Sequence, residues 1–180
     1  FFIEREAMLT QEVSRALVRL RVAKPALQFP ATQIHRQIGR EVDNAVRIHQ
    51  VARIYRQQAR APLAPVDPVL ELLRILLEES VEQIFRLLML VYRPEDIHLI
   101  YEHLRATDSY IRADAVELLD NLVEPAMRAT LLPILDEDRF LSRFDEPADA
   151  AEEPAVAYRV FQEAIWDHNS WLGVTVICAV

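Results

Sequence analysis

Glycine is almost missing from this chain of 180 residues, which contains only Gly39 and Gly173. Phosphate-binding loops of the Walker or Gly-x-Gly-x-x-Gly type need several glycines within a few residues, so both are excluded. Sandwiches and barrels made only of strands also use glycine in their many tight turns. The scarcity therefore points away from sheet proteins and toward a chain built from helices.

Proline marks the breaks between segments instead, for example at Pro30, Pro68, Pro94 and Pro125. Proline fits the first turn of a helix, and the residue before it resists helix. Between the breaks we expect helices at 3–23, 31–60, 68–92, 95–106, 109–123, 125–136, 154–168 and 170–180. No segment alternates apolar and polar residues with period two, so we predict an all-α fold with no sheet.

Apolar residues make up 52% of the sequence and charged residues 27%, which excludes disorder as the main state. The single cysteine, Cys178, excludes a disulfide framework and a cysteine-rich metal site, and it favours a reducing, cytoplasmic location. The opening Phe1-Phe2-Ile3-Glu4 does not resemble a signal peptide, and both ends look cut from a longer protein. No uncharged apolar stretch is long enough to predict a membrane span within the chain.

The charged residues are distributed unevenly along the chain, whose net charge is −8. Residues 1–60 hold 11 basic and 5 acidic groups, and residues 61–180 hold 9 basic and 23 acidic groups. A globally acidic protein is a poor nucleic-acid binder, so no nucleic-acid partner is expected. The two parts could attract each other, or the basic part could meet an anionic surface. Three arginines within about 40° of one helix face are the candidate anion-binding residues: Arg36, Arg40 and Arg47.

We expect two regions. Residues 1–61 form a basic helical cap or linker, and residues 62–180 form a helical repeat domain that is truncated at its C-terminus. The helix at 68–92 is apolar over more than half of its circumference and must lie between neighbours. Asp67 can cap this helix, and Glu82 can pair with Arg86 on its remaining polar strip. Residues 136–153 are acidic and are predicted to form a solvated loop.

One internal repeat is visible. Residues 108–119 align with 169–180, since each has a polar cap, a serine, an aromatic residue and a branched apolar residue, and each follows an amphipathic helix. A recurring helix–turn–helix unit is typical of an α-solenoid, a stack of antiparallel helix pairs. The order Asp108-x-x-Ile111-Arg112-x-x-Ala115 resembles the second helix of a HEAT repeat. That resemblance implies that Asp108 and Arg112 bond along the stack.

Residues 68–180 carry a further resemblance, in Gln83-Ile84-Phe85-Arg86-Leu87-Leu88, Val91-Tyr92-x-Pro94-Glu95-Asp96-Ile97 and Leu131-Leu132-Pro133-Ile134-Leu135-Asp136. These runs resemble the soluble HEAT-type module fused to bacterial transporters of the ATP/ADP-carrier (nucleotide exchange) kind. The resemblance implies a regulatory module at the inner face of the cytoplasmic membrane. It supplies no transport site, because no transporter residue is present.

Surface residues are the remaining candidates for function. Repeat helices commonly line a partner-binding face, and on 109–123 the candidates are Asp114, Glu117 and Asn121. Glu95-x-x-His98 is a single Glu-x-x-His unit, whereas di-iron bundles use two, so we predict no metal site. We also predict no catalytic residue and no cofactor.

The leading hypothesis is a non-catalytic interaction or regulatory module that binds a protein partner or other domains of its own chain. The alternative is a ligand-responsive sensor for a small anion such as a nucleotide. An enzyme, for instance a lyase of the HEAT-like bilin-attaching type, is a third hypothesis that the lack of catalytic candidates disfavours. We expect self-association through the cut helix at 170–180.

The repeat assignment also predicts one buried cluster, in which Leu118→Ala would lower stability by about 2–5 kcal/mol. Its members are Leu88, Leu99, Leu104, Ile111, Ala115, Leu118, Leu119 and Leu122.

Overall fold

The computed structural model describes residues 2–58 and 67–135, all of which lie in helices or in the short turns between them. The helices are α1 (Phe2–Ala23), α2 (Ala31–Gln58), α3 (Pro68–Val91), α4 (Pro94–Leu104), α5 (Ser109–Leu122) and α6 (Pro125–Leu135). Each begins and ends within two residues of its predicted range, and no strand occurs in the described ranges. The all-α prediction is therefore confirmed. The helices predicted at 154–168 and 170–180 and the loop predicted at 136–153 lie outside the described residues.

Local capping explains where α3 begins. One carboxylate oxygen of Asp67 accepts hydrogen bonds from the backbone N–H groups of Val69, at 2.9 Å, and Leu70, at 3.1 Å. Pro68 follows at the first helical position, where its missing N–H leaves no hydrogen bond unmade. The second carboxylate oxygen accepts from the Tyr55 hydroxyl of α2 at 3.2 Å, so one side chain both caps α3 and ties it to α2.

Replacing Asp67 with alanine is expected to destabilise the protein by about 1–2 kcal/mol, because it removes the cap of α3. Asp67→Asn keeps an acceptor for the backbone N–H groups and should recover most of that stability. Urea unfolding followed by circular dichroism measures both. Equal losses for the two variants would mean that the carboxylate charge, rather than the cap, supplies the stabilisation.

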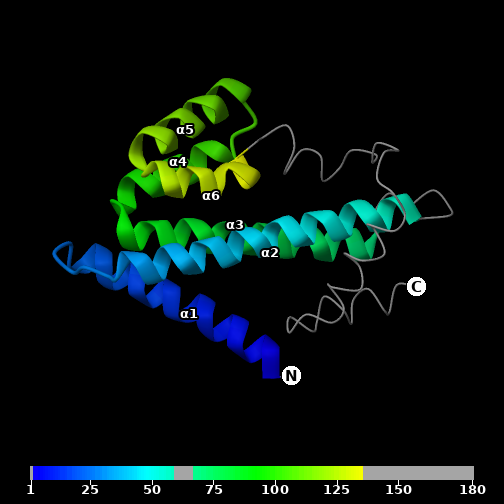
Figure 1. Cartoon of the computed structure of the whole chain (residues 1–180), viewed down its shortest axis with the longest axis horizontal. Coiled ribbons are helices and arrows are strands. Elements are labelled where there is room, and N and C mark those ends of the chain that lie inside the picture. The colour runs from blue at the N-terminus through cyan, green and yellow to red at the C-terminus, as the bar shows by residue number, and fades with distance from the viewer. Residues whose placement is uncertain (1, 59–66, 136–180) are drawn as a thin grey trace.

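Helix α3 lies at the centre of the molecule, where it packs against α1, α2 and α4. Figure 1 shows α2 and α3 running side by side in opposite directions, with α1 along one edge and α4, α5 and α6 on the other side. Ten residues of α3 are buried, including Leu73, Leu77 and Leu88, which are fully inaccessible to solvent. The prediction that this helix lies between neighbours is confirmed, because an apolar surface this wide cannot be covered from one side.

The core is continuous from α2 to α6. Helix α2 contributes a stripe of buried residues at spacings of three and four, namely Ile34, Ile38, Val42, Ala45, Ile48, Val51 and Ala52. Helix α6 packs on α2 and adds Met127 and Leu131 to the same core. In a strictly linear stack each helix pair meets only its neighbours, and the contact between α2 and α6 goes beyond that pattern. The solenoid arrangement and the division at residue 61 both stay predictions.

The predicted cluster around α5 is partly wrong. Leu88, Ala115 and Leu119 are fully buried, and Leu104 and Leu122 pack against the core. Leu99, Ile111 and Leu118, in contrast, are 51%, 40% and 46% exposed. The prediction assumed that the whole apolar stripe of this helix is buried. In the structure α5 packs on α4 and touches α6, so only the side that carries Ala115 and Leu119 is buried.

Candidate functional site

The outer side of α5 is the most distinctive surface among the described residues. At 100° per residue, six exposed residues fall within about 120° of the helix circumference. They form what we term the α5 face: Tyr110, Ile111, Asp114, Glu117, Leu118 and Asn121. Tyr110 is 86% exposed, so its ring stands almost free of the protein. The predicted partner-binding residues Asp114, Glu117 and Asn121 are all exposed and lie together on this face.

Contacts on the other side hold α5 in place. Asp108 caps the helix by accepting a hydrogen bond from the Tyr110 N–H at 2.8 Å. The Arg112 guanidinium donates to the carbonyl oxygens of Ala106 and Thr107, each at 3.0 Å, and so fixes the turn between α4 and α5. Arg112 therefore binds the backbone of its own turn, which the resemblance to HEAT repeats did not indicate. The α5 face is presented by a helix fixed at its start.

The α5 face carries negative charge that the described residues do not neutralise. Asp120, beside the face, forms an ion pair with Arg128 of α6 at 2.6 Å. Asp114 and Glu117 form no ion pair or hydrogen bond through their side chains with any residue in the described ranges. The face thus combines three large apolar side chains with two carboxylates that are open to a partner.

The predicted anion-binding arginines lie along α2 rather than around one point. Arg36 and Arg40 are exposed, and Arg47 is half-buried and engaged in interactions within the protein. With a rise of 1.5 Å per residue, Arg36 and Arg47 are separated by about 16 Å along the helix axis. Exposed Asp43 falls between them on the same side. One small anion cannot reach all three guanidinium groups, although Arg36 and Arg40 are one turn apart and can act together.

Glu41 follows Arg40 but turns away from solvent. Burial is the main cause that raises the pKa of its carboxyl group, and a hydrogen bond from the Gln37 amide, at 3.0 Å, acts in the opposite direction. Its charge is therefore a structural feature of α2 and adds little to the outer surface.

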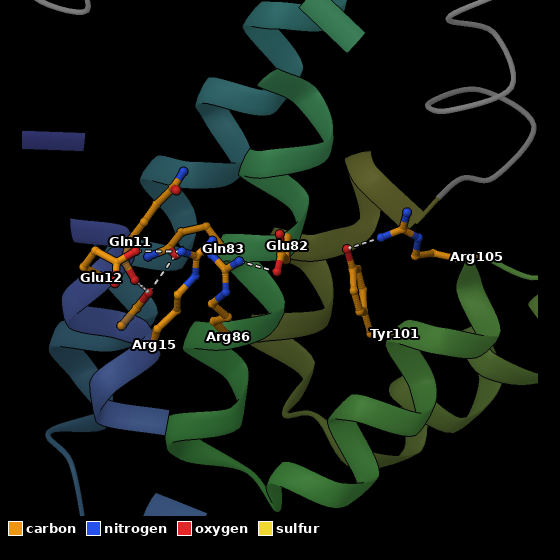
Figure 2. A network of polar contacts seen from close by, with 9 residues as sticks. Gln11, Glu12, Arg15, Glu82, Gln83, Arg86, Tyr101 and Arg105 are labelled. Atoms are coloured by element: carbon orange, nitrogen blue, oxygen red, sulfur yellow. Dashed lines mark hydrogen bonds and ion pairs between the residues drawn. The ribbon is translucent and has the colours of Figure 1, made fainter. Parts of the chain in front are cut away.

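A polar network inside the protein was not predicted (Figure 2). The Ser14 hydroxyl of α1 lies 2.8 Å from the Gln83 side-chain oxygen of α3, and that oxygen also accepts from Arg86 at 3.3 Å. Arg86 pairs with Glu82, as predicted, and it is only 8% exposed, so this part of the polar strip lies inside the protein. The guanidinium is buried because α1 covers this side of α3.

Tyr101 of α4 and Arg105, the residue that follows this helix, form a second polar pair near this network. Arg105 donates to the Tyr101 hydroxyl at 3.0 Å and also lies over the tyrosine ring, 5.5 Å from its centroid. Burial raises the pKa of the Tyr101 hydroxyl, and the Arg105 charge opposes that shift. The first network joins α1 to α3, the second lies at the end of α4, and neither presents a nucleophile paired with a base.

No cluster of three or more histidine, cysteine or carboxylate side chains suited to a metal occurs in the described ranges. Exposed His98 and Glu95 thus remain isolated on α4. Neither 2–58 nor 67–135 contains a helix that is both long and apolar enough to cross a membrane.

Comparison of the chain with protein-family models, curated proteins and solved structures gave no significant match. The resemblance to HEAT repeats and to transporter-fused modules therefore stays a prediction. Function must be inferred from the surface itself.

Proposed function

We propose that this chain is a non-catalytic helical module that binds another protein through the α5 face. The observation that carries the proposal is the exposure of Tyr110, Ile111 and Leu118 beside Asp114 and Glu117 on one side of one helix. Tyrosine is among the residues that most often supply the affinity of a protein interface, apolar side chains form the buried centre of the interface, and charges around it fix the orientation. Single exposed leucines are ordinary, but this grouping is not.

The partner chemistry follows from the charge of the face. An amphipathic helix with basic flanking residues fits best, because its apolar side can cover Ile111 and Leu118 while its basic groups reach Asp114 and Glu117. Helices that dock by an apolar stripe are a common recognition mode. Opposite charge also speeds association and rejects acidic competitors.

The context of the module is the second part of the proposal. The sequence resemblance supports a place in a larger protein, as a HEAT-like regulatory domain beside a membrane transporter at the cytoplasmic face. The antiparallel hairpin of α4 and α5 supports a HEAT-like unit, because such a pair is the building block of those repeats. A sensor for a small anion is the weaker alternative, since the three α2 arginines do not converge.

Two synthetic helical peptides test the α5 face. Both carry one leucine stripe, flanked by arginines in the first and by glutamates in the second. We expect the arginine peptide to bind, as measured by fluorescence anisotropy, and the glutamate peptide to bind at least about tenfold more weakly. Leu118→Ser and the double variant Asp114→Lys, Glu117→Lys should each weaken the arginine peptide by at least about tenfold.

Matched controls lie elsewhere on the surface. Leu132 of α6 is 61% exposed, so Leu132→Ser tests a general loss of apolar surface. Glu95→Lys with Glu102→Lys on α4 makes the same change in charge. Equal weakening by the controls, or equal binding of both peptides, would contradict the proposal. A photo-cross-link from position 118 to residues 170–180 of the same chain would assign the face to the chain's own continuation instead.

A further inference from the structure

Helix α1 has an apolar stripe on the side that faces away from the other described helices. Its members, Val13, Ala16, Leu20 and Ala23, alternate in spacing between three and four residues, and all four are exposed. Val13 is 54% exposed and Leu20 is 48% exposed. We call this set the α1 stripe. In the sequence, Leu9 stands at the next position of the same spacing.

The opposite side of α1 is already occupied. Ser14 is buried against Gln83 of α3, and Leu17 and Val18 pack against the core. Helix α1 packs on α3 and touches α4, and it forms one edge of the molecule in Figure 1. The α1 stripe therefore does not contribute to the core, and a solvated helix face would not require apolar residues at this spacing.

Spacing of this kind is typical of a helix that packs lengthwise against another helix. Apolar residues that repeat every three and four positions form a narrow seam, and small residues such as Ala16 and Ala23 let a second helix approach closely. The occupant that the stripe itself specifies is a second helix with the same seam, which a second copy of this chain supplies.

Charges beside the stripe fix the direction of that second helix. Glu12 and Arg19 are exposed and flank the stripe on one side, away from α3. Glu12 also pairs with Arg15 of its own helix at 2.7 Å, and because both side chains are exposed this contact is weak enough to exchange for one with a second copy. Consider an antiparallel pair in which Val13 lies opposite Ala16 of the second copy. Glu12 then lies beside Arg19 of the second copy. Because the pair is two-fold symmetric, Arg19 also lies beside Glu12 of the second copy. In a parallel pair Arg19 would face Lys24, so two basic groups would meet.

We propose that the α1 stripe is the contact of a two-fold symmetric dimer in which α1 packs antiparallel to α1 of a second copy. A self-complementary patch of this kind produces closed dimers rather than filaments. The α1 stripe spans only about three helical turns, so the dimer should dissociate at low concentration and form at high concentration. This inference uses a different surface from the α5 face and does not depend on it.

Sedimentation equilibrium of the full chain between about 5 and 500 µM tests the dimer. We expect a monomer–dimer equilibrium. Val13→Ser with Leu20→Ser should weaken dimerisation by at least about tenfold, because four apolar side chains leave the interface. Ile75→Ser, at a residue that is 41% exposed on α3, is the control and should leave the equilibrium unchanged. Circular dichroism checks that each variant keeps its helices.

Charge reversal tests the antiparallel direction. Glu12→Arg and Arg19→Glu should each weaken the dimer, and the double variant should recover most of the loss because the pair is restored with exchanged signs. A chain that stays monomeric, or one whose association is indifferent to Val13 and Leu20, overturns the proposal. Stronger association of Arg19→Glu would indicate the parallel pairing with Lys24 and would also overturn it.

Discussion

Replacing Phe85 with alanine is expected to lower the free energy of unfolding by about 3–5 kcal/mol, as is usual for a large aromatic residue in a core. Phe85 lies on α3 and is 2% exposed. Its ring centroid is 4.9 Å from that of Tyr101 on α4, with the planes tilted by 37°. The substitution removes an aromatic contact together with buried area, where α3 meets α4.

Guanidinium unfolding of the full chain measures this loss, with Phe85→Leu as the matched variant. Leucine fills much of the volume and should keep more than half of the stability. Domains of this size are commonly stable by only about 5–15 kcal/mol, so Phe85→Ala should also show an earlier thermal transition. A loss below about 1 kcal/mol would contradict the packing of α3 on α4.

Leu118 and Leu119 are neighbours in the sequence with opposite environments, and they give the second prediction. Leu119→Ala should destabilise the protein by about 2–5 kcal/mol, because Leu119 is fully buried between α5 and the rest of the core. Leu118→Ala should change stability by no more than about 0.5 kcal/mol, since nearly half of that side chain already contacts water. Both changes remove the same atoms from the same helix.

The same denaturant titration compares the two variants directly. A larger loss for Leu118 than for Leu119 would mean that α5 is rotated about its axis relative to the structure described above. It would also restore the buried cluster that the repeat pattern predicts, and it would remove the apolar part of the α5 face.

Helix boundaries could be predicted from the sequence because their signals are local. Asp67 and Pro68 mark the start of α3, and Asp108 marks the start of α5. The capping hydrogen bonds reach only two or three residues along the chain. The number of neighbours around a helix is not a local property. Ile111 and Leu118 were expected in the core because they are apolar, yet nothing in the sequence of α5 reveals that no other described helix covers one of its sides.

The same distinction between local and non-local signals explains which parts of the candidate site could be predicted from the sequence. That Asp114, Glu117 and Asn121 share an exposed side of α5 follows from helix periodicity, whereas their role in binding a partner stays a prediction. The buried network of Ser14, Gln83 and Arg86 could not be predicted, because three polar residues on two helices look solvated until the helices are packed. The Gln83 side-chain oxygen is satisfied there by its neighbours, whereas the Gln83 side-chain nitrogen is buried without a hydrogen-bond partner among the described residues.

The packing of α6 on α2 has a consequence for synthesis on the ribosome. About seventy residues separate the two helices in the chain, and translation proceeds at about 5–20 residues per second. The apolar stripe of α2 can pair with α3 early, but the part that α6 covers stays open for several more seconds. During that interval the nascent chain presents aliphatic residues to the surrounding medium, which makes it a substrate for chaperones that bind unfinished chains.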